Sequence, residues 1–202
     1  MKRILNIGCG DELYGTHRVD IVKTKSSNQE PFDANGQFPY PNNYFDEIFS
    51  RNLLEHLQNI KTFLSECHRV LKPNGKITLI TDNAGYWLFH NMKAKIKLHY
   101  GEYIPMVGAV NDSHFELFTP YHVWNYLRGN GFEKIKIRFI NFEDIYNGQP
   151  EIKLFQFWKP KNIISDLITW TIRHTQFYPM SWPKIIATAN KSSKTRRIIW
   201  QK

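Results

Sequence analysis

The sequence predicts an α/β fold with a mostly parallel sheet, and three observations support this prediction. Segments with strand-like and helix-like patterns alternate along the first half of the chain. A short apolar run, Ile4–Ile7, leads directly into Gly8-Cys9-Gly10. A second apolar segment contains Val19-Asp20-Ile21 a few residues later. Alternating strands and helices favour parallel strands covered on both faces of the sheet.

The individual elements follow from periodicity and from turn residues. Short runs rich in apolar and β-branched residues predict strands at residues 4–7, 18–22, 45–50, 76–81, 132–140 and 183–189. Residues 23–43 are polar and irregular, so we expect a connection there. Apolar residues at helical spacing predict a helix at 60–71, and the turn signal Lys72-Pro73-Asn74-Gly75 ends it. Thr119-Pro120 predicts the start of another helix, which ends near Gly129.

Length and composition are those of a single domain with a full hydrophobic core, expected to span residues 1–202. Hydrophobic residues make up 42% of the chain and aromatic residues 15%, which excludes general disorder. No apolar run approaches the ~20 residues that span a bilayer, and the run after Lys2 and Arg3 is too short for a secretory leader. Cys9 and Cys67 fall on a turn and a helix, so we expect reduced thiols and a cytoplasmic location.

The positive charge of the chain is confined to its second half. The formal net charge is +9, yet residues 1–90 carry ten Lys or Arg and ten Asp or Glu. Residues 91–202 carry seventeen Lys or Arg and eight Asp or Glu. This excess suits an anionic partner such as a phosphorylated small molecule, a nucleic acid or an anionic membrane surface. A charge that only keeps the protein soluble is the alternative.

The glycine turn and Asp20 together indicate a cofactor that contains a nucleoside. A strand that opens into Gly-x-Gly lets the backbone approach a ligand closely, because glycine lacks a side chain. A carboxylate at the tip of the neighbouring strand can hold the two hydroxyls of a ribose. A cofactor site is therefore expected where these two strands end.

Several longer strings, in this order and spacing, resemble the class I S-adenosylmethionine-dependent methyltransferases, in particular the small type 11 group. The strings are Leu5-Asn6-Ile7-Gly8-Cys9-Gly10, Val19-Asp20-Ile21, Phe38-Pro39-Tyr40-Pro41 with Tyr44-Phe45-Asp46-Glu47-Ile48, Leu53-Leu54-Glu55-His56-Leu57, Glu66-Cys67-His68-Arg69-Val70-Leu71-Lys72-Pro73-Asn74-Gly75-Lys76, and His114-Phe115 to Phe118-Thr119-Pro120 with Gly131-Phe132. The resemblance covers residues 4 to about 140. It implies a Rossmann-like, doubly wound sheet of seven strands, mostly parallel, with a C-terminal antiparallel hairpin formed by 132–140 and 183–189.

Three further segments receive an expected role. Residues 86–118 are expected to form a substrate lid with an aromatic lining, in which the alternating lysines of 93–99 form either a basic strip or a protected edge strand. Residues 141–181 form an insertion in the hairpin. An amphipathic helix that begins near Ile163 either packs on the sheet or makes a peripheral membrane contact. Residues 191–202 form a basic tail.

The first crossover departs from the family pattern. Gly8 and Asp20 are too close for the helix of several turns that normally joins the first two strands. The positive end of a helix dipole is then short or missing. We therefore expect the methionine carboxylate of the cofactor to depend more on loop amides, and the cofactor cleft to be more open.

The resemblance implies S-adenosyl-L-methionine as the cofactor and assigns it to particular residues. Those expected to contact it are Gly8, Cys9, Gly10, Asp20, Asp33, Ala34 and Asn52. The glycine turn would line the methionine and ribose parts, and Asp20 would accept hydrogen bonds from the ribose hydroxyls. Asp33 would take the adenine amino group, although Asn28 or Glu30 could replace it.

Asp82 and His114 are the candidates for a group that accepts a proton during catalysis, because both fall near the expected carboxyl end of the sheet. A purely structural histidine is the alternative. Some relatives bind a divalent metal through Glu-x-x-Glu-His on a helix. Here Asn52 replaces the first Glu of that triplet, so we expect no metal and assign Glu55 and His56 to the wall of the cleft.

The resemblance implies methyl transfer to an O or N atom of a small molecule, a glycan or a lipid head group, and the charge favours an anionic one. Ser50-Arg51-Asn52-Leu53 stands where enzymes that methylate base amines carry Asn/Asp-Pro-Pro-Tyr/Phe, and no Pro-Cys nucleophile lies there. Two alternatives stay open. One is an RNA methyltransferase that uses the basic second half, and the other is a cofactor-binding partner subunit without catalysis.

Overall fold

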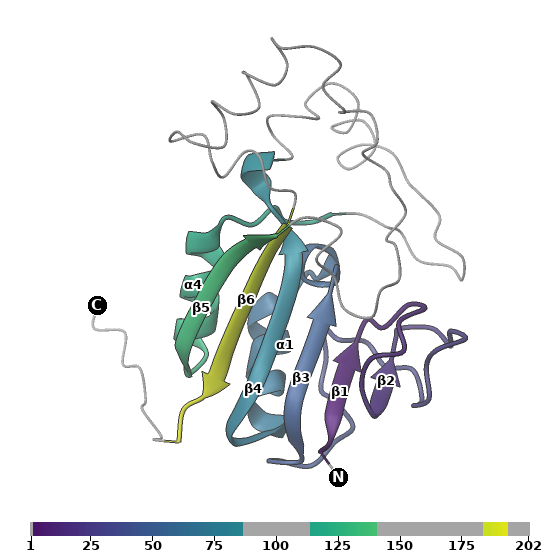
Figure 1. The fold of residues 1–202 in the computed structure, drawn as a ribbon. Coiled ribbons are helices and arrows are strands. Elements are labelled where there is room, and N and C mark those ends of the chain that lie inside the picture. Colours follow the sequence, from purple (N-terminus) through teal and green to yellow (C-terminus); the bar gives the residue numbers. More distant parts are fainter. Residues whose placement is uncertain (1, 87–113, 141–183, 194–202) are drawn as a thin grey trace, which may run out of the picture.

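The computed structural model describes residues 2–86, 114–140 and 184–193, which form one mixed sheet with helices packed against it (Figure 1). The sheet has six strands in the order β2-β1-β3-β4-β6-β5. Their bounds are β1 Ile4–Ile7, β2 His17–Val19, β3 Phe45–Arg51, β4 Leu71–Asp82, β5 Phe132–Ile140 and β6 Lys184–Lys191. β1 to β4 are parallel, while β6 lies antiparallel between β4 and β5. The predicted α/β fold and its antiparallel C-terminal pair are confirmed, with six strands in the described residues where the resemblance implies seven.

The described part also contains the 3₁₀ helix η1 (Leu54–His56), α1 (Ile60–Val70) and α4 (Pro120–Gly129), and residues 84–86 are helical as well. Figure 1 shows α1 and α4 behind the sheet, on the same face. Both helices bury their apolar residues in the main core together with the strands. Within the described residues α1 and α4 cover one face, so the expected cover of both faces by helices stays a prediction. On the other face, Tyr14 of the β1–β2 connection packs against Phe49, with ring centroids 4.9 Å apart.

The α1 helix forms where the periodic apolar pattern predicted it. Its five buried residues are Ile60, Phe63, Leu64, Cys67 and Val70, which recur at helical spacing on one face. The side chain of Asn59 caps the first turn by accepting a hydrogen bond from the Thr62 amide. The chain becomes extended at Leu71, ahead of Pro73, and enters β4.

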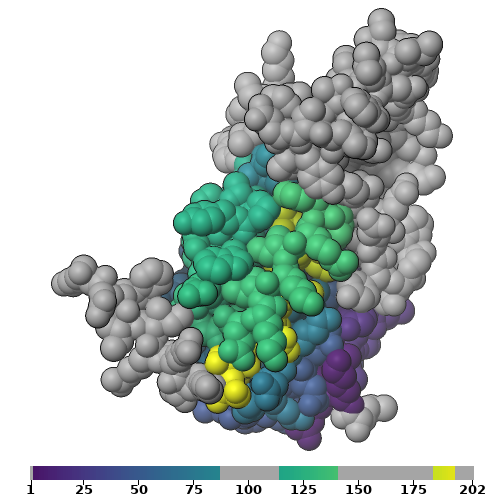
Figure 2. All heavy atoms as spheres, turned by 60° about the vertical axis from the view of Figure 1, so that its left-hand side comes forward, coloured from purple at the N-terminus to yellow at the C-terminus, as the bar shows by residue number. Residues whose placement is uncertain are grey.

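The α4 helix begins with the predicted cap. The Thr119 hydroxyl accepts from the His122 amide, the His122 ring accepts from the Thr119 amide, and Pro120 fills the first helical position. The helix ends at Gly129, and Gly131 then takes a left-handed conformation at φ +84°. Figure 2 shows the side chains of α4 and β5 forming the molecular surface at this edge, where Tyr121 and Trp124 are exposed.

The connection between β2 and β3 is irregular, as predicted, and Arg69 of α1 holds its second half in place. The Arg69 guanidinium donates to the carbonyls of Phe38 and Tyr40 at 2.9 and 2.7 Å and forms an ion pair with Glu66 at 2.6 Å. The Glu66 carboxylate also accepts from the Phe38 amide. These bonds replace a strand ladder, which explains how the segment stays ordered beside the sheet.

The first crossover is short, and this prediction is confirmed within the described residues. Residues 8–16 join β1 to β2 without a helix. β2 is shorter than the predicted 18–22, because Asp20 turns the chain by accepting a hydrogen bond from the Ile21 amide. β4 and β6 are longer than predicted, and their pairing continues as far as Lys76 and Asn190.

Other predictions fall wholly or largely outside the described residues. These are the lid at 86–118, the insertion at 141–181 with its amphipathic helix, and the basic tail at 191–202. In the part of the chain that the structure describes, no helix has the length and apolar character needed to cross a membrane.

Candidate functional site

Polar and ionisable side chains gather at the carboxyl ends of the parallel strands, where ligands bind in folds of this architecture. They form two groups. The cofactor half comprises the glycine turn after β1 and the residues after β2. The acceptor half comprises the ends of β3 and β4, η1, the segment 114–118 and the start of β6.

The glycine turn of the cofactor half is fastened to β2. The amides of Gly8 and Cys9 both donate to the carbonyl of Val19, at 2.9 and 3.1 Å. Gly8 and Gly10 have left-handed φ angles of +70° and +49°, which favour glycine. No atom lies within 4 Å of the point where a Cβ on Gly10 would be, so this side of the turn is open to a ligand.

Asp20 lies at the tip of β2, where the sequence predicted a ribose acceptor. Its Oδ2 accepts from the Gly10 amide and its Oδ1 from the Ile21 amide, both at 2.8 Å. A carboxylate oxygen has two lone pairs, so each can accept a further hydrogen bond from a ligand hydroxyl. The next residue, Ile21, exposes 47% of its surface and offers an apolar contact beside the carboxylate.

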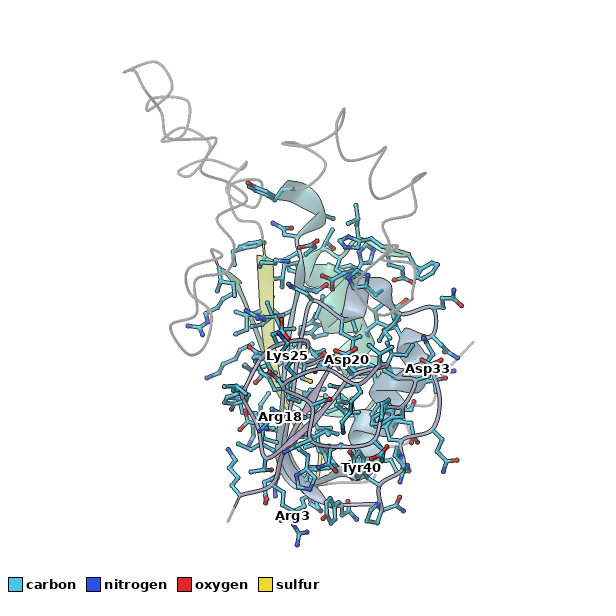
Figure 3. All side chains as sticks on the ribbon, turned by 90° about the vertical axis from the view of Figure 1, so that its right-hand side faces the viewer. Arg3, Arg18, Asp20, Lys25, Asp33 and Tyr40 are labelled. Carbon is cyan, nitrogen blue, oxygen red and sulfur yellow. The ribbon has the colours of Figure 1, made fainter. Side chains whose placement is uncertain are left out.

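Asp33 and Ala34 have a well-defined structural role. The Asp33 carboxylate accepts from the amide and the side chain of Asn35 at 2.8 and 3.0 Å, which closes a turn. Ala34 is buried in the core. Figure 3, which faces the β2 edge, shows Asp20 and Asp33 at similar heights, both nearer the carboxyl end than Arg3 and Tyr40. Their predicted part in adenine binding stays a prediction.

The acceptor half is centred on Asp82, which is 2% exposed at the end of β4. Lys184 forms an ion pair with Asp82 Oδ1 and also donates to the side-chain oxygen of Asn52 at 2.8 Å. His114 Nδ1 lies 3.6 Å from Asp82 Oδ2. The predicted pair Asp82 and His114 is therefore brought together, and Lys184 joins it.

The strand arrangement explains why these residues meet. Because β6 runs antiparallel to β4, its first residue, Lys184, stands opposite the last residue of β4, Asp82. The segment that carries His114 lies beside the end of β4, since Asn83 pairs with Phe118 and the Ala84 amide donates to the Phe118 carbonyl at 2.8 Å. Lys184 was within the predicted strand, but its pairing with Asp82 had no signal in the local sequence.

Glu55, a residue of η1, is the second buried carboxylate of the acceptor half. It is 1% exposed, accepts from the Thr81 hydroxyl at 2.7 Å, and offers its carbonyl to the Phe115 amide at 2.8 Å. Burial, and secondly the nearby Asp82 carboxylate, raises the pKa of Glu55. The rings of His56 and His114 pack edge to face, with centroids 4.6 Å apart.

Glu55, His56 and His114 each offer one donor atom, and the three atoms lie within 4.8 Å of one another. One carboxylate and two imidazoles are donors that divalent metals accept. The sequence predicted no metal, because Asn52 replaces a carboxylate. In the structure the Asn52 side chain accepts from the Lys184 ammonium instead, so a lysine supplies positive charge at this place. The three donors could hold a cation, and the absence of a metal stays a prediction.

A model of a known family matches part of the chain. Residues 14–79 match the model of the type 11 family described as a methyltransferase domain. The match indicates a methyltransferase domain of the type 11 group, in agreement with the resemblance seen in the sequence. For such a domain the resemblance implies S-adenosyl-L-methionine as the cofactor. No curated protein matches the sequence.

Solved structures share the fold of this chain. An S-adenosylmethionine-dependent methyltransferase from Archaeoglobus fulgidus matches with a TM-score of 0.60 and 18% identity, over 94% of this chain and 86% of the other. A methyltransferase of this kind from Thermotoga maritima matches with a TM-score of 0.60 and 13% identity, over 95% of this chain and 83% of the other. Phosphoethanolamine N-methyltransferase 2 from Haemonchus contortus, in complex with phosphomonomethylethanolamine and S-adenosylhomocysteine, gives 0.57 and 17%, over 95% of this chain and 49% of the other.

The residues of the cofactor half suit S-adenosyl-L-methionine. The open side of Gly10 leaves room for it, and the Asp20 carboxylate is held in place by two backbone amides. Preorganised acceptors of this kind lose little entropy when a ribose binds. Of the predicted cofactor residues, Asn52 belongs to the acceptor half by its side chain, while its amide donates to the Ile80 carbonyl at 2.8 Å.

Proposed function

We propose that this methyltransferase acts on an O or N atom of an anionic small molecule, glycan or lipid head group. The observation that carries the proposal is the buried group of Asp82, His114 and Lys184 at the end of β4. A proton acceptor is needed when the methylated atom is protonated at neutral pH, as a hydroxyl is. The site offers one next to the strand ends that are proposed to hold the cofactor.

His114 is the proposed proton acceptor, and Asp82 orients it. The carboxylate faces Nδ1, which favours the tautomer with a proton there and leaves the lone pair of Nε2 for the acceptor molecule. The bound cofactor supplies an electrophilic methyl group on its sulfonium. His114 would take the proton of the acceptor atom as that atom is methylated. Alignment of the two reactants in a dry site contributes up to about 7–11 kcal/mol.

Charge supports an anionic acceptor. The whole excess of positive charge falls in residues 91–202, which include His114 and Lys184. One structure that shares the fold holds a phosphorylated amine, phosphomonomethylethanolamine, so phosphorylated amines and alcohols are the first compounds to test. RNA carries the same kind of charge and is the second candidate. RNA binding would weaken steeply as salt is added.

The decisive experiment labels the acceptor. The protein is incubated with S-adenosylmethionine labelled in its methyl group and with fractionated cell extract, and label is measured in lipid, glycan, small-molecule, protein and RNA fractions. Label in lipid, glycan or small molecules supports the proposal. Label in RNA or protein alone overturns the acceptor class. Cofactor binding without label in any fraction overturns catalysis and favours a partner subunit.

Asp20→Ala tests the cofactor half separately. The substitution removes an ionised acceptor for ribose hydroxyls, so the affinity for S-adenosylhomocysteine should fall about 10-fold to 100-fold by calorimetry. Asp11→Asn is the matched control, since Asp11 is an exposed carboxylate in the neighbouring connection between β1 and β2. Equal binding by Asp20→Ala and the parent protein would contradict the assigned ribose contact.

A further inference from the structure

The amino-acid end of the cofactor needs partners that the glycine turn does not provide. This end carries an ammonium and a carboxylate group. The short crossover has no helix whose N-terminus could face the carboxylate. The expectation that loop amides take over this task also meets a difficulty. The amides of Gly8 and Cys9 donate to Val19, that of Gly10 to Asp20, and that of Glu12 to Cys9.

An ion pair lies beside this turn. Arg51 is the last residue of β3, one position beyond the paired residues Ile7 and Ser50, so it stands next to Gly8. Its Nε lies 3.5 Å from Oε1 of Glu12, which belongs to the first crossover. The Arg51 side chain is 21% exposed and that of Glu12 is 7% exposed.

Glu12 is held from below by the sheet. The Asn6 side chain, on β1, donates to Glu12 Oε2 at 3.1 Å and to the carbonyl of Tyr14 at 3.1 Å. A buried carboxylate is costly unless it is paired and hydrogen-bonded. Asn6 and Arg51 both meet this need, and they fix the carboxylate at the end of the sheet where the cofactor binds.

We propose that Arg51 and Glu12 form the subsite for the amino-acid end of the cofactor. The guanidinium has five donors in a planar fork that suits a carboxylate. It can therefore bind the cofactor carboxylate while it stays near Glu12. The Glu12 carboxylate accepts from the cofactor ammonium. A pair of opposite charges thus recognises a ligand end that also carries opposite charges, and it replaces the missing helix N-terminus. This inference rests on the proposed use of the cofactor.

Three ligands separate this subsite from the rest of the cofactor half. S-adenosylhomocysteine carries both charged groups, its decarboxylated analogue keeps only the ammonium, and 5′-methylthioadenosine keeps neither. Arg51→Gln should lower the affinity for S-adenosylhomocysteine about 10-fold to 100-fold, measured by calorimetry, and leave the affinities for the other two ligands unchanged. Glu12→Gln should lower the affinities for S-adenosylhomocysteine and its decarboxylated analogue and leave the affinity for methylthioadenosine unchanged. Arg51→Lys, which keeps the charge without the fork, should fall between Arg51→Gln and the parent.

Several outcomes would overturn the inference. An equal loss of affinity for all three ligands in Arg51→Gln would show that the ion pair only fastens the crossover to β3. Unchanged binding of S-adenosylhomocysteine in both variants would show that neither residue contacts the amino-acid end. Failure of the parent protein to bind any of the three ligands would instead contradict the cofactor itself. Thermal unfolding of each variant checks that it is folded. Glu12→Gln is nearly isosteric, so it provides the test if Arg51→Gln does not fold.

Discussion

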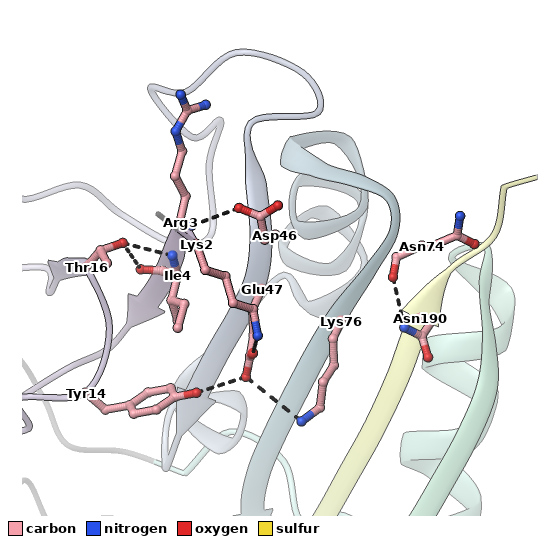
Figure 4. Close-up of polar contacts among 10 residues, drawn as sticks. All are labelled: Lys2, Arg3, Ile4, Tyr14, Thr16, Asp46, Glu47, Asn74, Lys76 and Asn190. Atoms are coloured by element: carbon pink, nitrogen blue, oxygen red, sulfur yellow. Dashed lines mark hydrogen bonds and ion pairs between the residues drawn. The ribbon is translucent and has the colours of Figure 1, made fainter.

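The two ends of the sheet carry the same types of charged residue in opposite surroundings. At the amino end, buried Glu47 accepts from the Lys2 ammonium at 2.6 Å and the Tyr14 hydroxyl at 3.0 Å, and Lys76 lies 4.0 Å away (Figure 4). The two lysines are 55% and 42% exposed. At the carboxyl end, the side chain of Lys184 is 6% exposed and that of His114 is 8% exposed.

This difference in burial indicates which end of the sheet carries the functional site. Lysines that reach a carboxylate from solvent keep most of their hydration, so their pairs cost little and contribute little. Charges that are both buried lose their hydration, and a core of apolar residues would often be as stable. We infer that the buried charges of the carboxyl end are kept for chemistry, whereas those of the amino end fasten neighbouring strands. The predictions below test that contrast.

The largest expected effect is on turnover. His114→Gln removes the proposed proton acceptor and should lower kcat about 10²-fold to 10⁴-fold for a hydroxyl acceptor. The affinity for S-adenosylhomocysteine should stay unchanged, because His114 belongs to the acceptor half. Steady-state rates with the acceptor identified by labelling, together with calorimetry, check both statements. Tyr14→Phe at the amino end is the control and should keep the parent kcat. A His114→Gln enzyme with normal kcat would assign His114 a structural role.

The next effect concerns stability. Lys184→Met leaves Asp82 buried without its lysine, so the free energy of unfolding should fall by about 3–5 kcal/mol. Lys2→Met removes an exposed lysine from a buried glutamate and should cost about 1 kcal/mol or less. Unfolding in urea measures both variants. Adding Asp82→Asn to Lys184→Met should recover part of the loss, because the uncompensated charge is then gone. Equal losses in the two single variants would remove the contrast between the ends.

The elements were predictable where the signal is local. The strand Ile4–Ile7 and the helix over 60–70 follow from apolar periodicity, and the start of α4 follows from Thr119-Pro120. Asp20 was selected in the same way, because a carboxylate after a strand and close to a glycine turn is a local pattern; the structure places it beside Gly10, and its ribose contact stays a prediction. Such features depend on a few neighbouring residues, so one sequence is enough to predict them.

The missed features depend on contacts between distant segments. Lys184 and Asp82 are 102 residues apart, and they meet only because β6 enters the sheet antiparallel beside β4. No local pattern encodes this register. Glu12 gave no signal either, since its burial depends on Asn6 and Arg51 rather than on its own neighbours. Asp33 shows the reverse case, in which a local turn explains a residue that the family resemblance assigned to the cofactor.

The smallest expected effect compares two of the buried glutamates, Glu55 and Glu47, as a function of pH. Burial raises the pKa of Glu55 above its ordinary value of 4.5, so the folded state disfavours the charged form. The contribution of Glu55 to stability is then complete below about pH 4.5 and is lost as pH rises through the raised pKa. Glu55→Gln removes this loss and keeps an acceptor for the Thr81 hydroxyl. Its unfolding free energy should therefore equal or exceed that of the parent at pH 8, and its advantage should shrink at pH 5.

Glu47→Gln is the matched variant at the amino end, and its effect should have the opposite sign. It weakens the acceptor of Lys2 and Tyr14, so about 1 kcal/mol of stability should be lost at pH 8. Urea unfolding of both variants at the two pH values gives the comparison. If Glu55→Gln lost as much stability as Glu47→Gln at pH 8, the ionised Glu55 would be a stabilising partner of Lys184. The acceptor half would then be held together by its charges, as the amino end is.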